Sequence, residues 1–427
     1  MRLEHDLVRL PHGLTLALAP LPYVESVSMG LWVRAGGRHE PAALSGAGHF
    51  IEHLVFKGTP ARSARAISRA IEGRGGHVNA FTQEDSTCFY AHVAAERAPE
   101  VFDILCDIFL HARLAERDVA GEKPVILEEI ASYRDQPAHR VHEILDELLW
   151  ARHPLGRNLA GSEATVGRLT AGALRRYKDR VYVPANTIVT LAGRLDGEDW
   201  TARVRRAFAR RAPGRRTAFR PVLASTPQRA LDASARPIEQ THLAMGFRCF
   251  GRRDPRRHAL RVLSIVLGET LSSRLFHLIR EQRGLAYSIQ SEVQLFDDTG
   301  VFAIDAGLDA DRDRQALALI FEQLRRIRDR PVSPQELKLA KDYAAGQLKI
   351  GLETSSSRMM WLGEHLAAYD RVVQPDEILD GLRAVTADDL RALARRLFVP
   401  RRLSVALIAP DAAERRAAEL RTLMERL

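Results

Sequence analysis

The chain has 427 residues, 46% of them hydrophobic and 27% charged, a globular composition that allows two to four domains and excludes a disordered chain. The sequence contains no run of about 18 uncharged apolar residues, which excludes a membrane-spanning helix, and its three scattered cysteines argue against a disulfide framework. The 63 basic residues outnumber the 54 acidic ones, but aromatic residues do not alternate with the arginines. We therefore expect a solvated basic surface without nucleic-acid or membrane partners.

The first residues of the chain, 1–13, do not form the apolar stretch that a signal peptide requires. Glu4, His5 and Asp6 are polar residues at positions where such a stretch would lie. The cysteines also lack the spacings that are typical of zinc sites. We therefore expect a reduced, soluble protein of the cytoplasm.

Hydrophobic patterns predict a mixture of strands and helices along the chain. Short runs rich in β-branched residues predict strands at 27–33, 188–192 and 301–306. Apolar residues at helical spacing predict helices at 64–72, 101–114, 138–149, 315–327 and 334–349. The strands do not alternate regularly with helices, and the sequence has no glycine-rich phosphate loop. The pattern therefore favours a layered α+β fold over a doubly wound nucleotide-binding sheet.

Similar segments recur at a constant distance, which indicates an internal repeat. One and the same offset relates three pairs of positions, namely Gly30 with Gly246, Thr170 with Thr386 and Pro184 with Pro400. We therefore expect two homologous α/β-sandwich repeats, each a mixed sheet with helices packed on it. Residues 1–211 would form an N-terminal domain and residues 238–427 a C-terminal domain, joined by a Pro- and Arg-rich linker at 212–237.

The sharpest motif in the chain is His-Phe-Ile-Glu-His at 49–53. On a helix, His49 and His53 are four residues apart, so both imidazoles project from one face and can bind one metal ion. Glu52 lies beside that face, where its carboxylate can hydrogen-bond a water molecule on the metal. Ser45 precedes the motif and is expected to cap the helix. For this pentapeptide alone, two partly buried and hydrogen-bonded histidines without a metal are the alternative.

A catalytic zinc ion needs a third protein ligand, and the best candidates are glutamates further along the chain. Glu122 and Glu129 are seven residues apart, which places them two turns apart on one helical face, and Val125 and Ile126 are expected to pack between them. Two carboxylates on a buried face are costly unless a cation meets them, so one would bind the metal and the other would support a ligand. Spacing alone does not choose between Glu128 and Glu129, and a solvated acidic helix edge is the alternative.

The histidine motif belongs to a longer string, Gly46–Thr59, through which the chain resembles the pitrilysin-type (M16) zinc peptidases, whose metal motif is inverted. The resemblance extends over essentially the whole chain. It is strongest for the short, two-domain branch that includes the β subunit of the mitochondrial processing peptidase and bacterial relatives. It implies that Glu129 is the third ligand of one Zn²⁺ ion per chain and that Glu122 is the supporting carboxylate.

The resemblance also implies residues that contact a peptide substrate. Asn79, Ala80 and Phe81 match the family's edge strand, which pairs with the backbone of an extended peptide. Arg280 and Tyr287 match an Arg–Tyr pair, seven residues apart, that reaches the substrate carbonyl and its developing negative charge. Without the family context, Asn79 would be a turn residue, and the Arg and Tyr would be an ion-pair residue and a half-buried phenol.

Together these features predict a zinc metalloendopeptidase that hydrolyses peptides or small unfolded polypeptides, held as extended strands in a closed chamber. Glu52 would take a proton from the attacking water and deliver it to the leaving amine, while Arg280 and Tyr287 would stabilise the oxyanion. Family members of this length need two chains to close the chamber, so the resemblance implies a homodimer, or a heterodimer with a related subunit. The corresponding stretch of the second repeat, 261–268, has no histidine pair.

Two other functions compete with the peptidase. Some relatives have lost their metal ligands, so the chain could be a non-catalytic or partner-dependent structural subunit of a peptidase complex. The intact set of His49, Glu52, His53 and Glu129 argues for activity instead. A basic nucleic-acid binder ranks far behind, and a steep salt dependence of retention on DNA or RNA would be its signature.

Overall fold

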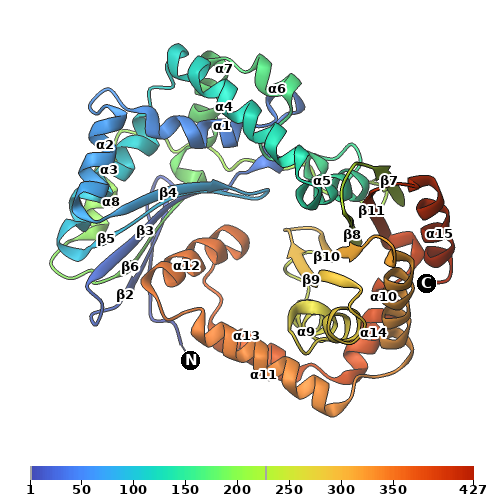
Figure 1. Ribbon diagram of the computed structural model, residues 1–427. Coiled ribbons are helices and arrows are strands. Elements are labelled where there is room, and N and C mark those ends of the chain that lie inside the picture. Colours follow the sequence, from blue (N-terminus) through green and yellow to red (C-terminus); the bar gives the residue numbers. More distant parts are fainter. Residues whose placement is uncertain (1, 227) are drawn as a thin grey trace. The chain divides into compact units, whose positions relative to one another are not determined.

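The computed structural model describes residues 2–226 and 228–427, which form two compact units. Each unit is assembled from three separate stretches of the chain. Each is built around one mixed β-sheet with helices on both faces (Figure 1). The first unit contains Met1–Ala131, Arg157–Arg220 and Lys349–Pro375, and the second contains Ser132–Gly156, Pro221–Leu348 and Asp376–Leu427.

The first unit contains a six-stranded sheet in the order β1-β2-β6-β3-β5-β4. Strands β2 and β6 run parallel, and all other neighbours run antiparallel. The sheet therefore leaves β4 as one free edge. The strands are β1 (Asp6–Arg9), β2 (Thr15–Pro20), β3 (Ser26–Val33), β4 (His77–Thr82), β5 (Thr87–Ala94) and β6 (Thr187–Gly193).

The second unit contains a five-stranded sheet in the order β7-β11-β8-β10-β9. Strand for strand, this order and these directions repeat those of β2-β6-β3-β5-β4, because β7 and β11 run parallel and the other neighbours antiparallel. The expectation of two α/β-sandwich repeats with mixed sheets is thereby confirmed. The strands are β7 (Leu231–Ala235), β8 (Gln240–Cys249), β9 (Ala286–Leu295), β10 (Gly300–Asp309) and β11 (Leu403–Ala409).

In the first unit, side chains of β3 alternate between two hydrophobic cores. Leu31 faces the larger core, whereas Trp32 faces a smaller one that helix α12 (Ser355–Tyr369) completes (Figure 1). The larger core is covered by α1 (Ala47–Leu54), α2 (Ala64–Ile71), α3 (Ala98–His111), α4 (Glu116–Asp135), α6 (Glu163–Arg168), α7 (Ala171–Val181) and α8 (Trp200–Phe208).

The second unit repeats this arrangement. Helix α5 (Pro137–Leu149) covers one face of its sheet and completes a small core with β8, β10 and β11. The larger core on the other face also includes the π-helical segments η8 (Ile265–Glu269) and η9 (Phe276–Gln282). Its helices are α9 (Arg257–Ser264), α10 (Asp313–Asp329), α11 (Pro334–Ile350), α13 (Pro375–Ala384), α14 (Ala387–Leu397) and α15 (Ala413–Glu425).

The two halves of the chain exchange a helix. Helix α5 follows α4 directly but packs on the second sheet, and α12 follows α11 but packs on the first. Glycines allow both contacts, because a Cβ would lie 2.6 Å from Met359 Sδ at Gly30 and 2.8 Å from Leu149 Cδ1 at Gly246. The compact units are thus interleaved along the chain. The predicted domains 1–211 and 238–427, with a linker at 212–237, describe the repeat in the sequence, and that division stays a prediction.

The constant distance between equivalent residues of the two repeats is kept at the helix that precedes the last strand of each sheet. Thr170 and Thr386 cap α7 and α14 through their side chains. Gly30 and Gly246 are separated by the same distance in the sequence, but they pair with residues of the last strand that are not equivalent. Gly30 lies opposite Thr190, whereas Gly246 lies opposite Ser404, two positions earlier than the offset predicts. A shift by two positions leaves side chains on the same face of a strand, so both glycines still face the exchanged helix.

The predicted strands and helices are confirmed, with two differences. The helix expected at 101–114 begins and ends three residues earlier, because Pro99 suits a first turn and the backbone leaves the helical region at Ala112, where ψ is 130°. The stretch expected as a linker, 212–237, contains strand β7 of the second sheet. That strand reads Leu-Asp-Ala-Ser-Ala, and its low β-propensity explains why the pattern did not reveal it.

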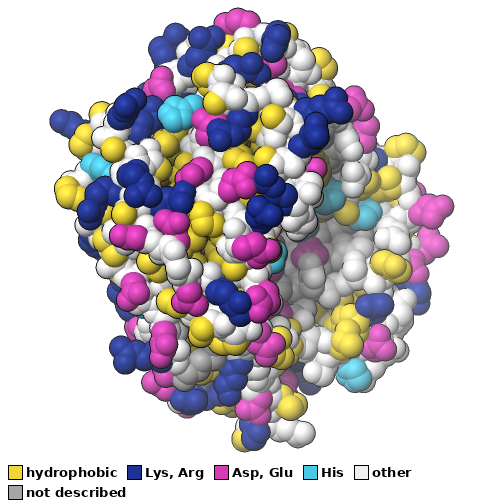
Figure 2. Space-filling view, turned by 90° about the vertical axis from the view of Figure 1, so that its left-hand side faces the viewer, with side chains coloured by type: hydrophobic (Ala, Val, Ile, Leu, Met, Phe, Trp, Pro, Cys, Tyr) yellow, Lys and Arg dark blue, Asp and Glu magenta, His cyan; other side chains and the backbone are white. Residues whose placement is uncertain are grey.

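The surface mixes charges of both signs. On the face drawn in Figure 2, Lys and Arg side chains are interspersed with Asp and Glu instead of gathering into one basic field. This agrees with the interpretation of the excess arginines as a solvated exterior. Among the described helices, none combines the length and apolar composition that crossing a membrane requires.

The packing of α12 on the first sheet can be tested at Gly363, where a Cβ would lie 1.9 Å from Trp32 Cε2. We expect Gly363→Ala to lower the free energy of unfolding by about 1–3 kcal/mol, because the buried indole leaves no room for the methyl group. The matched control is Gly346→Ala in α11, where a Cβ meets nothing within 4 Å, and it should stabilise by about 0.5–1 kcal/mol. Urea unfolding of both variants measures the difference, and an unchanged midpoint for Gly363→Ala would contradict the packing.

Candidate metal centre

Helix α1 is held at its first turn by a buried carboxylate. The backbone N–H groups of Gly46 and Gly48 donate to the two oxygens of Glu40 at 2.7 and 2.6 Å. Gly46 has a left-handed φ of 92°, and a Cβ on Gly48 would lie 3.0 Å from the carboxylate. The expectation that Ser45 caps this helix is wrong, because Glu40, which precedes it in the chain, fills that place. Burial raises the pKa of Glu40 to about 7, although both N–H groups act against the rise.

The two histidines of α1 point to one place. The Nε2 atoms of His49 and His53 each lie 3.6 Å from a carboxylate oxygen of Glu129. One ligand atom from each of the three residues lies within 4.8 Å of the other two. On the opposite side of the helix, Phe50 and Ile51 are fully buried in the core and hold the helix in place. Two imidazole nitrogens and one carboxylate oxygen are a donor set that suits zinc.

Helix α4 supplies the carboxylates. Glu122 is buried and Glu129 is half-buried, while Glu128 is exposed and does not belong to the cluster that His49 and His53 form with Glu129. The structure therefore brings Glu129, not Glu128, to the imidazoles. Ile126 packs in the core on the same side of the helix. The expectation that Val125 packs there too is wrong, because its side chain is 51% exposed.

Glu122 orients His53. One carboxylate oxygen of Glu122 lies 3.0 Å from His53 Nδ1, and the other lies 2.5 Å from Lys57 Nζ. Burial acts to raise the pKa of Glu122, but Lys57 and His53 outweigh burial and hold that pKa below its usual value. An ionised carboxylate only accepts hydrogen bonds, so Nδ1 of His53 donates to Glu122 and Nε2 is the ring atom that faces Glu129.

The other two polar side chains of the motif, Glu52 and His49, have pKa values that burial shifts. The hydroxyl of Thr82 on β4 donates to Glu52 at 2.7 Å. Burial raises the pKa of Glu52, and the charge of Glu129 adds to that rise. Burial, and then the neighbouring His53, lower the pKa of His49 to about 4. A neutral imidazole is the form that binds metals.

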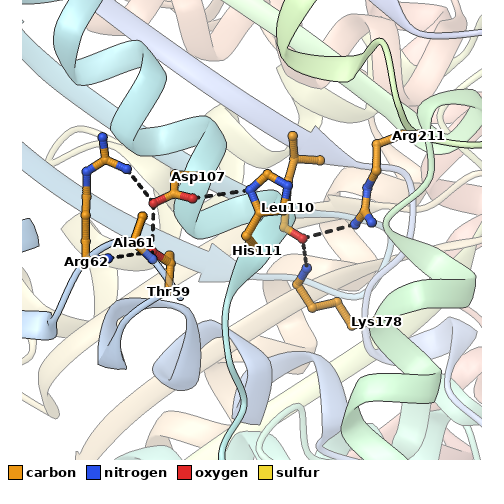
Figure 3. A network of polar contacts seen from close by, with 8 residues as sticks. All are labelled: Thr59, Ala61, Arg62, Asp107, Leu110, His111, Lys178 and Arg211. Atoms are coloured by element: carbon orange, nitrogen blue, oxygen red, sulfur yellow. Dashed lines mark hydrogen bonds and ion pairs between the residues drawn. The ribbon is translucent and has the colours of Figure 1, made fainter.

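The segment after α1 is tied to helix α3, and this fixes Lys57. Asp107 accepts hydrogen bonds from Thr59 Oγ1 at 2.7 Å and from Arg62 Nη1 at 2.6 Å (Figure 3). Arg113 Nη2 donates to the carbonyl of Lys57 at 3.1 Å. The same figure shows Lys178 and Arg211 donating to the carbonyl of Leu110 near the end of α3. These contacts support the lysine that pairs with Glu122.

Sequence reasoning did not identify four of these supporting groups, namely Glu40, Lys57, Thr82 and Asp107. Lys57 lies in the string Gly46–Thr59 and Thr82 directly follows Phe81 of the expected edge strand, so position beside a motif was the available signal. Glu40 and Asp107 have no periodic relation to the histidines, and only the tertiary structure brings them to this site.

Strand β4, which contains the residues expected to bind a peptide, lies at the free edge of the first sheet. In β4, Asn79 is exposed, Ala80 is buried, and Phe81 is half-buried. Within the described sheet, β4 has β5 as its single neighbour, and the backbone N–H of Ala80 donates to Asn79 Oδ1 at 2.8 Å. Because the side chain of Asn79 accepts this hydrogen bond, the N–H of Ala80 points to the open edge of the sheet instead of to β5. The binding role of these residues stays a prediction.

Arg280 and Tyr287 belong to the second unit. Arg280 lies in η9, with its guanidinium 4.7 Å from the centre of the Phe276 ring, and Tyr287 on the edge strand β9 is 75% exposed. Arg280 also lines a cavity of about 830 Å³ bounded by η8, β9 and α11. Both side chains are free to meet a substrate, and their catalytic role stays a prediction.

Comparisons with known proteins agree with this geometry. Residues 15–163 match the model of the insulinase family (peptidase family M16), and residues 168–343 match that of the M16 inactive domain. A protein of Mycobacterium tuberculosis named as an uncharacterized zinc protease is 37% identical over 412 residues, which cover 95% of this chain and 93% of the relative. A Bacillus subtilis protein of the same description is 34% identical over 403 residues, covering 94% and 97%.

Solved structures share the fold. A protease from Helicobacter pylori superposes with a TM-score of 0.88 at 21% identity, covering 95% of this chain and all of the other. A protein from Pseudomonas fluorescens described as a peptidase M16 inactive domain superposes with a TM-score of 0.89 at 18% identity, covering 96% and 99%. At these identities the likeness shows the fold alone.

The cap of α1 can be tested by replacing one of its two acceptor oxygens with an amide nitrogen. We expect Glu40→Gln to lower the free energy of unfolding by about 1–3 kcal/mol at neutral pH, because the amide leaves one buried N–H without an acceptor. The matched control is Glu128→Gln, an exposed carboxylate of α4 that should change stability by less than about 0.5 kcal/mol. Chemical unfolding measures both, and equal effects of the two changes would argue against the cap.

Proposed function

The chain belongs to peptidase family M16, and from this premise we propose that it is a zinc-dependent endopeptidase of peptides or small unfolded polypeptides. The observation that carries the proposal is that one ligand atom each of His49, His53 and Glu129 lies within 4.8 Å of the other two. Zinc proteases among the curated relatives support the choice of metal. We propose one Zn²⁺ ion per chain.

The protein side of the reaction follows from the contacts at the motif. A zinc ion held there would polarise the scissile carbonyl and increase the acidity of a water molecule. Glu52 accepts the proton of that water as its oxygen attacks the carbonyl carbon, and returns a proton to the amine as the C–N bond breaks. The hydroxyl of Thr82 donates to one oxygen of Glu52 and so orients the carboxylate. The raised pKa of Glu52 brings its proton affinity closer to that of its reaction partners at neutral pH.

Strand β4 offers a way to hold the substrate. An extended peptide can pair with the free edge of β4 by adding a strand to the sheet, which recognises backbone more than sequence. Thr82 of this strand contacts Glu52, so a peptide on the edge passes close to the general base. Asn79 would release the N–H of Ala80 to the peptide, and Phe81 would contact its side chains.

Arg280 and Tyr287 would act on the oxyanion of the tetrahedral species. We propose that two chains form a homodimer, or a heterodimer with a related subunit, in which these residues of one protomer serve the metal site of its partner. A closed chamber would then surround the peptide. A purely structural subunit is the alternative function, and the complete donor set of His49, His53 and Glu129 argues against it.

The proposed activity predicts chelator-sensitive cleavage of a peptide library, followed by mass spectrometry. Glu52→Gln should retain zinc, measured by elemental analysis, and lose at least about 10²-fold in kcat because the proton acceptor is gone. His49→Ala should lose the metal itself. Glu128→Gln, which changes the exposed carboxylate next to Glu129, serves as the matched control. Cleavage that persists in Glu52→Gln, or that ignores the chelator, would refute the mechanism.

The shared site predicts complementation between two inactive variants. Arg280→Ala and Glu52→Gln chains are each expected to be nearly inactive alone. Mixing them should restore up to about a quarter of the wild-type activity, since half of the randomly assorted dimers are mixed and each has one intact site. Activity that stays at the level of the separate variants would show that the residues of one site do not come from two chains.

A further inference from the structure

Two arginine-rich segments of the second unit, far apart in the chain, lie side by side. The first is the loop 252–257 that leads into α9, which reads Arg-Arg-Asp-Pro-Arg-Arg. The second is 395–402, the end of α14 and the turn that follows it, with four arginines among its eight residues. Their convergence is unrelated to the metal centre, which is formed by residues of the first unit.

Two adjoining hollows lie between these segments. The larger, of about 420 Å³, is lined by His258 of α9 and Val385 before α14. The smaller, of about 210 Å³, is lined by Phe250 and Arg402. Arg256, Arg396 and Leu393 line both, so two guanidinium groups stand where the hollows meet. Together the hollows have the size of a small-molecule site.

Arg256 is held rigidly in place. Its Nε and Nη2 donate to the two oxygens of Asp254 at 2.9 and 2.6 Å, and its guanidinium lies 4.6 Å from the centre of the Phe250 ring. These contacts leave the N–H groups of Nη1 for another acceptor. A guanidinium fixed in this way loses little freedom when an anion binds.

The other two arginines have unused donors. Within residues 2–226 and 228–427, no hydrogen bond or ion pair engages the side chain of Arg396. Arg402 donates from Nη1 to the carbonyl of Arg248 at 3.0 Å, but its Nε is buried and has no partner among those same residues. A buried donor without an acceptor is costly, and an oxyanion in the smaller hollow would supply one.

The neighbouring acids neutralise this crevice only in part. Asp254 offsets the charge of Arg256, and Asp389, which accepts hydrogen bonds from the backbone and hydroxyl of Thr386 at the start of α14, offsets one more, so that three arginines face two carboxylates. Burial, and then Arg257, lower the pKa of His258 to about 4, so that this ring is neutral at pH 7. The balance of the charges that face the two hollows is therefore positive.

We propose that this crevice, lined by Arg256, Arg396 and Arg402, is a binding site for a phosphate group carried by a small molecule. Several guanidinium donors converging from different elements match the many acceptors of a tetrahedral dianion. The apolar surface of Leu393 and Val385 continues the site and suits the body of an organic phosphate. Such a ligand would bind the second unit whether or not the chain is a peptidase.

Inorganic phosphate is the first probe, titrated into the full-length protein by calorimetry at constant ionic strength. Arg396→Gln removes one charged donor without breaking any contact, and it should weaken phosphate binding at least about tenfold. The matched control is Arg391→Gln on the same helix, which is paired with Asp388 and lies outside the hollows. It should bind phosphate like the wild type. Both variants keep the metal centre, so phosphate bound to a metal ion would not distinguish them.

Phenyl phosphate tests whether the natural ligand is an organic phosphate or free inorganic phosphate. An organic phosphate as the natural ligand predicts tighter binding of phenyl phosphate than of inorganic phosphate, because the ring would cover Leu393 and Val385. Equal binding of the two would assign the site to free phosphate. The proposal is overturned if wild-type protein binds neither probe in the millimolar range, if chloride at equal ionic strength competes fully, or if Arg396→Gln binds phosphate as the control does.

Discussion

The hydrogen bond between His53 and Glu122 joins the two helices that carry the metal donors. Helix α1 has only eight residues, too few to be stable alone, so its orientation depends on what holds its ends. Glu40 holds the first turn, and Lys57, just after the helix, bonds the same Glu122 that orients His53. These contacts between the chain's own residues hold the donors close together, which reduces the ordering that binding an ion would otherwise require.

The two repeats show how one fold separates chemistry from architecture. Their sheets share strand order and direction, yet the first repeat has a histidine-bearing α-helix where the second has α9 and the π-helical η8. Duplicated strands therefore do not imply duplicated function. In each unit, the helix that covers the second face of the sheet comes from the other half of the chain, so neither half can bury its own sheet alone.

Patterns within short stretches of sequence predicted the helices and strands, which depend mainly on neighbouring residues. Helical spacing located the histidine pair, and β-branched runs located β3, β6 and β10. The choice of Glu129 over Glu128 needed the family resemblance, because residue spacing does not say which way α4 faces. Glu40 and Asp107 escaped prediction, since each acts on a segment to which only the tertiary structure brings it. The register shift at Gly246 is equally invisible to a constant offset.

The exchanged helix also has a consequence for biosynthesis. The last strand of the first sheet ends at Gly193, whereas α12 begins only at Ser355. At about 5–20 residues per second, a ribosome needs roughly 8–32 s to make the interval between them. During this interval, helix α12 is not yet available to cover the indole of Trp32 and its apolar neighbours. The nascent chain therefore exposes an apolar surface that is prone to aggregation until α12 has been synthesised.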